Sequence, residues 1–188
     1  MAMQPDTDKR RNGFAQIYAQ LFRDFRDKPI RILEIGVLKG GSLWLWTELF
    51  PHPETLVVGI DLEIPEDPLP ANAKVHVCDQ NDPAGLQRIV AQYGPFDLIF
   101  DDGCHFTKET RLCFETLFSS VKDNGYYIIE DWAVGYWDDR DVRYRGMVEV
   151  VTEIMQQAPA KSIDAFLIAL NPGRTYAVFR KGTTGWKH

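Results

Sequence analysis

Acidic residues stand at or near the ends of five short apolar segments, and this repeated placement is the most informative chemical feature of the sequence. The residues are Glu34 (followed by Gly36), Asp61, Asp79, Asp101 with Asp102, and Glu130 with Asp131. Short apolar runs that alternate with helical patterns are typical of parallel strands buried on both faces. Ligands bind at the carboxyl ends of such strands, so we expect these acids to gather around one ligand site.

Two of these strand ends carry paired carboxylates. Asp131 follows Asp102 by 29 positions, which is room for one crossover helix between adjacent parallel strands. Asp102, Glu130 and Asp131 would then offer oxygen ligands to Mg²⁺ and leave positions for water or a substrate oxygen. His105 is placed to accept the proton of a metal-bound alcohol as general base. The plainer alternative is a loop histidine that hydrogen-bonds a neighbouring backbone group.

The glycine-containing loop after the first apolar segment limits which classes of nucleotide ligand the protein could bind. Gly36 and Gly41 have the spacing of a phosphate-binding NTPase loop, but Ser42 stands where that loop requires lysine. Leu38 stands at the second glycine of the dinucleotide fingerprint, so close approach of a pyrophosphate is not provided for. Asp61 follows Gly36 by 25 positions, near the separation of about 20 at which an acidic strand end binds ribose hydroxyls. S-adenosylmethionine, an adenosine ligand without pyrophosphate, fits these features.

The elements that must position these residues follow from apolar periodicity. A helix is expected over residues 14–25, and the strand and helix patterns that follow predict an α/β fold with a parallel sheet covered on both faces. Residues 163–170 and 175–180 flank a turn sequence and predict an antiparallel pair at one end of the sheet. The other expected strands are 31–36, 56–60, 75–78, 96–100 and 126–129, and the other helices 43–50, 83–93, 107–121 and 142–157.

Composition narrows the class of protein. The 188 residues are 45% hydrophobic and suit one compact domain, and a net charge of −6 argues against a nucleic-acid partner. Residues 97–141 hold 11 acidic and 4 basic side chains, which form either a solvated face or a cation site. The three cysteines form no CxxC pair, and no run of roughly 18 apolar residues predicts a membrane helix. We therefore expect a cytoplasmic protein without a membrane partner.

Five motifs occur in order between residue 7 and about residue 137. They are Thr7-Asp8-Lys9, Ile32–Val37 with Gly40–Leu43, Cys78-Asp79-Gln80, Asp101–His105, and Glu130-Asp131-Trp132 with Tyr136-Trp137. Together they resemble the Mg²⁺-dependent sugar O-methyltransferases of macrolide and related natural-product pathways, the mycinamicin type. Cys104 stands at the usual serine of that family, and this sequence shows no counterpart of the long additional N-terminal domain of the macrolide enzymes.

The resemblance implies a Rossmann-like methyltransferase fold, with a mostly parallel seven-stranded sheet, a C-terminal antiparallel hairpin and one domain over residues 1–188. The helical segment 1–29 would pack near the cofactor site. S-adenosylmethionine and Mg²⁺ would be the cofactors, and a hydroxyl of a sugar or glycoside would accept the methyl group. By this resemblance His105 is the general base, Asp102, Glu130 and Asp131 bind the metal, and the cofactor pocket is lined by Glu34, Gly36, Asp61, Asp79, Gln80 and Asp101.

Several alternatives stay open. A metal-dependent phenol or catechol O-methyltransferase would also combine a metal with strand-end acids. Related sequences are labelled cephalosporin hydroxylase, but the sequence shows no evident His/carboxylate iron triad. A non-enzymatic nucleoside- or sugar-binding module would bind its ligand whether or not His105 and Mg²⁺ are present. Trp132, Tyr136 and Trp137 would either stack on a sugar or only pack. Assembly as a homo-oligomer also stays open, and no sequence feature marks an interface.

Overall fold

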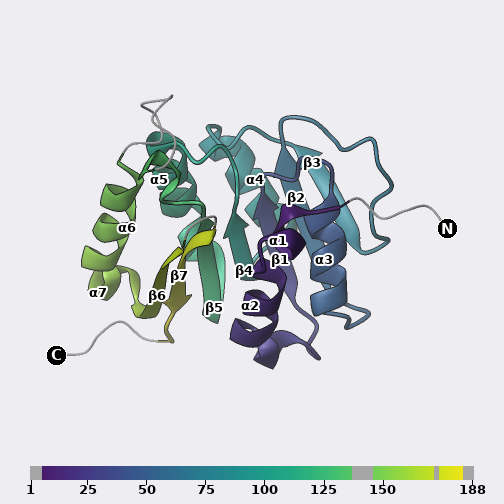
Figure 1. Ribbon diagram of the computed structural model, residues 1–188, viewed down its shortest axis with the longest axis horizontal. Coiled ribbons are helices and arrows are strands. Elements are labelled where there is room, and N and C mark those ends of the chain that lie inside the picture. The colour runs from purple at the N-terminus through teal and green to yellow at the C-terminus, as the bar shows by residue number, and fades with distance from the viewer. Residues whose placement is uncertain (1–5, 137–145, 172–173, 184–188) are drawn as a thin grey trace.

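A computed structural model describes residues 6–136, 146–171 and 174–183. A seven-stranded sheet with the strand order β3-β2-β1-β4-β5-β7-β6 runs through the middle of the molecule (Figure 1). The strands are β1 (Arg31–Ile35), β2 (Leu56–Asp61), β3 (Ala73–Val77), β4 (Phe96–Asp101), β5 (Val121–Glu130), β6 (Ile163–Asn171) and β7 (Arg174–Lys181).

The pairing of the strands confirms the predicted fold class. The first five strands in chain order pair in parallel, whereas β7 pairs antiparallel with both β5 and β6. Pro172 and Gly173 of the expected turn lie outside the described residues, as do residues 142–145 of the expected helix 142–157 and Trp137. The strand order reverses direction between β1 and β4, which is where ligands bind in open α/β sheets.

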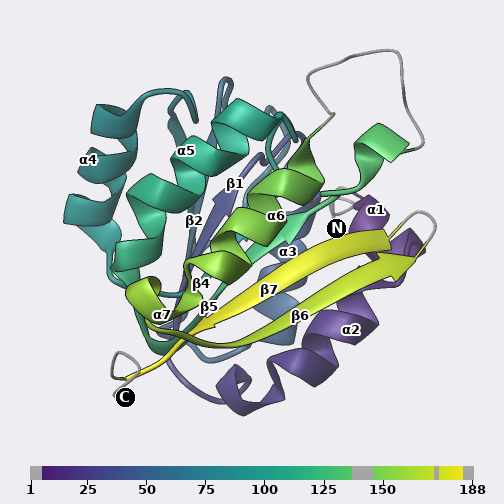
Figure 2. The same cartoon turned by 90° about the vertical axis from the view of Figure 1, so that its left-hand side faces the viewer.

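Helices cover both faces of the sheet, as Figure 2 shows. One face packs against α2 (Phe14–Leu21) and α3 (Gly41–Leu49), and the other against α4 (Pro83–Tyr93), α5 (Thr107–Leu117) and α6 (Met147–Gln156). The remaining short helical segments are α1 (Asp8–Arg11), η1 (Arg23–Phe25), η2 (Phe118–Ser120), η3 (Val134–Tyr136) and α7 (Ala158–Lys161). Within the described ranges, no helix combines the length and apolarity needed to cross a membrane.

Alternation along the strands assigns each side chain to one face. In β4, Leu98 and Phe100 join the apolar cluster under α2 and α3, whereas Ile99 joins the cluster under α4 to α6. Side chains of a strand alternate with a period of two, so Asp101 continues the Ile99 side and Asp102 the Phe100 side. The same rule places Glu130, two residues after Ile128, on the α2–α3 side.

The predicted helix over residues 107–121 is wrong at its end. The helix stops at Leu117, a 3₁₀ turn follows, and Val121 already pairs with Phe96 of β4. Strand β5 is therefore longer than the apolar run 126–129, because its first residues form an irregular pairing with a register shift between Phe96 and Leu98. Residues 122–124 of this first stretch are partly or fully exposed, so the sequence there lacks the apolar signal of a buried strand.

Candidate functional site

A cavity of about 1060 Å³ lies at the carboxyl ends of strands β1 to β5. Its size suits a small-molecule ligand. Seven of the residues predicted from the sequence line it: Gly36, Asp61, Asp79, Gln80, Asp102, His105 and Asp131. The other three, Glu34, Asp101 and Glu130, are each at most 2% exposed and lie behind the wall.

Gly36 is the point at which the ends of β1 and β4 come closest. Its φ is +86°, and a Cβ atom at this position would lie 2.1 Å from the carbonyl oxygen of Asp102. Its N–H donates to the Ile60 carbonyl, while the Asp102 N–H donates to the Ile35 carbonyl. Only glycine satisfies both the left-handed backbone and this close approach. The glycine therefore fixes the spacing between the loop after β1 and the loop after β4.

Asp61 binds the same loop from the end of β2. Its Oδ2 accepts hydrogen bonds from the N–H groups of Val37 and Leu38, at 2.7 and 2.8 Å. Its Oδ1 accepts the Leu62 N–H at 2.6 Å. A carboxylate held by three backbone donors keeps a fixed orientation, with its remaining lone pairs available at the cavity.

Gln80 holds the loop that carries His105. Its Oε1 accepts the Cys104 N–H at 2.9 Å, so the end of β3 is joined to the loop after β4. Asp79, which is exposed, accepts the Asn81 N–H through Oδ1 at 2.8 Å. These contacts give Gln80 a positioning role that its place in the sequence motif did not specify.

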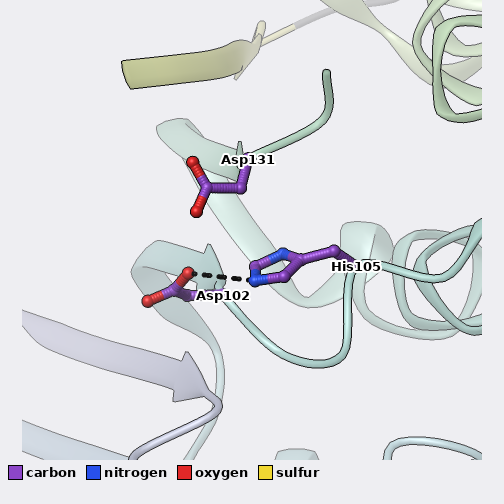
Figure 3. A group of neighbouring side chains, drawn as sticks. All are labelled: Asp102, His105 and Asp131. Carbon is purple, nitrogen blue, oxygen red and sulfur yellow. Dashed lines mark ion pairs between the residues drawn. The ribbon is translucent and has the colours of Figure 1, made fainter. Parts of the chain in front are cut away.

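Asp102, His105 and Asp131 form the polar centre of the cavity (Figure 3). One possible ligand atom from each residue lies within 4.8 Å of those of the others, and His105 Nε2 is 3.8 Å from Asp102 Oδ1. Two of the three adopt left-handed backbone, with φ of +56° at His105 and +50° at Asp131. Non-glycine residues in this region cost about 1–3 kcal/mol each, and such outliers concentrate at functional sites.

Glu130 lies on the same side of the sheet as Asp102 but is not one of the three residues whose possible ligand atoms meet. Its side chain points to the α2–α3 side, where Oε2 accepts a hydrogen bond from Lys9 Nζ at 2.9 Å. Its other oxygen, Oε1, is buried without a hydrogen-bond partner among the described residues. Glu34 lies on the same side, accepts from the Ser42 hydroxyl at 2.7 Å, and has Oε1 3.9 Å from Lys9 Nζ.

Lys9 lines the cavity, and reasoning from the sequence did not place it there. The residue is 1% exposed, and its ammonium forms ion pairs with Asp102, Glu130 and Glu34. A lysine in a polar N-terminal segment gave no sign of burial. The only available signal was the Thr7-Asp8-Lys9 motif in the family resemblance.

Burial and mutual repulsion perturb the acids around the cavity. Burial raises the pKa of Glu34 to about 7, against the opposing effects of Lys9 and Ser42. Burial also raises the pKa of Asp101 to about 7, although Tyr127 donates to Asp101 Oδ2 at 2.8 Å. For Asp131, burial raises the pKa against the charge of His105, and Asp102 raises it further. All three groups resist ionisation unless positive charge is supplied nearby.

Three aromatic residues, Trp132, Tyr136 and Trp137, follow the acidic motif at Glu130 and Asp131. Trp132 is 5% exposed, and its indole Nε1 donates to the Ala169 carbonyl at 3.2 Å. This favours the packing alternative for Trp132. Tyr136 closes the short helix η3, while Trp137 lies outside the described residues.

Comparisons with known proteins agree with this architecture. No profile of a known protein family matches the chain. Demethylmacrocin O-methyltransferase of Streptomyces fradiae and mycinamicin VI 2''-O-methyltransferase of Micromonospora griseorubida are each 37% identical to it over 131 residues. The alignments cover 66% of this chain and 33% and 32% of those proteins, so the chain spans about a third of the length of these relatives.

Among solved structures, the MycE methyltransferase from the mycinamycin biosynthetic pathway is similar with a TM-score of 0.75 and 28% identity, over 95% of this chain and 56% of that one. It was solved with Mg and SAH, and also with mycinamycin VI. The chain thus has the Rossmann-like fold of S-adenosylmethionine-dependent methyltransferases and, over 66% of its length, is similar in sequence to these two O-methyltransferases.

Proposed function

We propose that this chain is the catalytic domain of an S-adenosylmethionine- and Mg²⁺-dependent O-methyltransferase whose acceptor is a hydroxyl of a sugar or glycoside. The observation that carries the proposal is the meeting of Asp102, His105 and Asp131 in a cavity that Gly36 and Asp61 also line. A proton acceptor and a cation site would therefore share one cavity with an adenosine-containing methyl donor. The homologous relatives named as sugar O-methyltransferases support the acceptor class.

The side chains present suit a divalent cation. Carboxylate oxygens are the ligands that Mg²⁺ prefers, and Asp102 and Asp131 offer them beside His105. Among the described residues, the buried Oε1 atom of Glu130 has no hydrogen-bond partner, and Lys9 is shared by three acids. We propose Asp102 and Asp131 as metal ligands, with Glu130 as the third. When bound, Mg²⁺ would supply Lewis acidity that makes the acceptor hydroxyl more acidic.

His105 is the proposed general base. Figure 3 shows its ring turned toward Asp102 and Asp131, with Nε2 on the side of Asp102. In the reaction, Nε2 would accept the proton of the acceptor hydroxyl as the oxygen attacks the methyl carbon, while the bond from that carbon to sulfur breaks and S-adenosylhomocysteine leaves. The left-handed backbone at His105 and the hydrogen bond from Cys104 to Gln80 hold the ring in this orientation.

The chain's remaining contribution is the orientation of the donor. Asp61 would accept hydrogen bonds from ribose hydroxyls, and the loop at Gly36 gives the donor access to the backbone. Glu34 and Asp101, which lie behind the cavity wall, would act by fixing Ser42 and Tyr127. Holding donor and acceptor in line is worth many orders of magnitude in rate for a displacement of this kind. We expect this activity in the cytoplasm, since all three cysteines are free thiols.

Variants at His105 test the proposal. With S-adenosylmethionine, Mg²⁺ and a panel of glycosides and catechols, His105→Gln should lower the rate of methyl transfer by about 10²- to 10⁴-fold, the usual contribution of a general base. Calorimetric titration should show unchanged binding of S-adenosylmethionine. His52→Gln, the same substitution at a histidine that does not line the cavity, is the matched control and should retain the rate.

The outcomes separate the alternatives. Full activity in excess EDTA would refute the metal part of the proposal, and full activity of His105→Gln would refute the general base. A preference for catechols over glycosides would favour the phenol-type enzyme. Binding of S-adenosylmethionine without methylation of any acceptor in the panel would favour the non-enzymatic module.

A further inference from the structure

A buried lysine from the N-terminal segment reaches the ends of three strands. Lys9 lies on α1, yet its side chain is 2% exposed and its ammonium contacts Glu34 of β1, Glu130 of β5 and Asp102, which follows β4. A buried charge is retained only where it is paired and hydrogen-bonded. The separation of 93 residues between Lys9 and Asp102 makes this a tertiary contact rather than a local one.

Lys9 and the predicted metal side share the Asp102 carboxylate. Oδ2 of Asp102 pairs with Lys9 Nζ, while Oδ1 is the oxygen nearest His105 Nε2, at 3.8 Å. The ion pair with Lys9 thus holds the Asp102 carboxylate in an orientation in which its other oxygen points toward His105 and Asp131. Among the described residues, only Lys9 and His105 pair with Asp102. Loss of the Lys9 ammonium would therefore leave His105 as its one partner.

Lys9 also fixes the wall of the cavity. Thr7, Asp8, Lys9 and Arg11 all line it, and the Thr7 hydroxyl caps α1 by accepting the Lys9 N–H. A helix of four residues is too short to be stable alone, so its position depends on tertiary contacts. The Lys9 ion pairs are its most buried ones, because the Arg10–Glu48 pair at 2.8 Å is 39% and 46% exposed.

We propose that Lys9 is a positioning residue of the metal site, an internal cation that orients Asp102 and Glu130 and anchors residues 7–12 as a wall of the cavity. The inference rests on the proposed function, because it assigns Lys9 a task toward the cation that Asp102 and Asp131 would bind. Removal of the ammonium would leave Asp102 and Glu130 facing one another as unpaired acids. Their repulsion would turn the Asp102 carboxylate away from the orientation that serves the metal.

Lys9→Met tests the proposal, because methionine keeps the length of the side chain and removes its charge. Mn²⁺ serves as the probe, and its binding is followed by electron paramagnetic resonance with no methyl donor or acceptor present. Amide hydrogen exchange of residues 7–12 in metal-free protein gives a second, independent readout. Arg10→Met is the matched control, since it removes a positive charge from the same helix at an exposed pair.

If Lys9 positions the metal ligands, Lys9→Met should bind Mn²⁺ about 10- to 100-fold more weakly, which is the usual effect of losing a residue that orients metal ligands. The same role also predicts faster exchange in residues 7–12, with both measurements unchanged in Arg10→Met. The double variant Lys9→Met/Glu130→Gln also removes the acid of Glu130, which Lys9 no longer neutralises. It should fold more stably than Lys9→Met, and the backbone amides of residues 7–12 should still exchange fast. It guards against a single variant that merely fails to fold.

Equal or tighter Mn²⁺ binding in Lys9→Met would overturn the orienting role, because Lys9 would then only compete with the metal as a counter-ion. Unchanged exchange in residues 7–12 in Lys9→Met and in the double variant would overturn the anchoring role. A wild-type protein that binds no Mn²⁺ would refute the proposed metal site together with the orienting role of Lys9. The exchange measurement would still decide whether Lys9 anchors the N-terminal segment.

Discussion

Replacing Glu34 by glutamine should flatten the dependence of stability on pH. Glu34 is fully buried behind the cavity, and burial raises its pKa to about 7 from an ordinary value of 4.5. Between these two values the folded protein holds a proton that the unfolded chain has released. The stability of the wild-type protein therefore falls as the pH rises from 4.5 to about 7 and levels off above that. The glutamine amide of the variant cannot titrate, so this loss disappears.

The size of the effect follows from the same two values. Each pH unit between them corresponds to about 1.4 kcal/mol, so the free energy of unfolding of Glu34→Gln should gain roughly 3 kcal/mol on that of the wild type between pH 4.5 and pH 7.5. Ser42 donates to Glu34 Oε2 at 2.7 Å and favours the ionised acid. Ser42→Ala should therefore raise the pKa of Glu34 and shift the fall in stability to higher pH.

Urea unfolding in EDTA at a series of pH values measures the difference between the two proteins. Asp164→Asn is a control of opposite sign, because hydrogen bonding to Arg180 lowers the pKa of Asp164. The stabilisation that this acid provides is present at neutral pH and is lost as the pH falls through its folded pKa. Parallel profiles for wild type and Glu34→Gln between pH 4.5 and pH 7.5 would refute the reasoning.

Three further changes test the cavity. Gly36→Ala should destabilise the fold by about 1–3 kcal/mol and abolish S-adenosylmethionine binding, because the added Cβ would lie 2.1 Å from the Asp102 carbonyl oxygen; unfolding and calorimetry would detect this. Asp61→Asn should weaken S-adenosylmethionine binding at least about tenfold in calorimetry, since it replaces charge-assisted hydrogen bonds by neutral ones; unchanged affinity would remove Asp61 from the site. Gln80→Leu should lower turnover more than donor affinity, because the loop bearing His105 loses its hydrogen bond to Gln80; equal losses in both would contradict that role.

The strands and most helices could be predicted because their signals are local. Helix α4 matches its predicted range, since Asp82 accepts the Ala84 N–H as N-cap and Pro83 starts the helix. The buried parallel strands appear as apolar runs that end in acids. The start of β5 could not be predicted, because its pairing with β4 rather than its own residues makes it a strand.

The sequence suggested which residues belong to the candidate site more readily than how those residues are arranged. Reasoning from strand ends identified Asp102, His105 and Asp131, which the structure brings together. Alternation with a period of two already implied that Glu130 and Asp131 point to different faces, although adjacency in the sequence suggested one ligand group. The burial of Lys9 depends on a contact across 93 residues, which no local pattern encodes.

Incubation of the wild-type protein with S-adenosylmethionine and a glycoside panel, with mass analysis of the products, tests the central claim most directly. The account predicts a product heavier by one methylene group, formed with Mg²⁺ and absent in EDTA. Formation of that product at the same rate in EDTA would contradict the metal site. Failure to methylate any member of the panel, together with no calorimetric binding of S-adenosylmethionine at any Mg²⁺ concentration, would contradict the whole account.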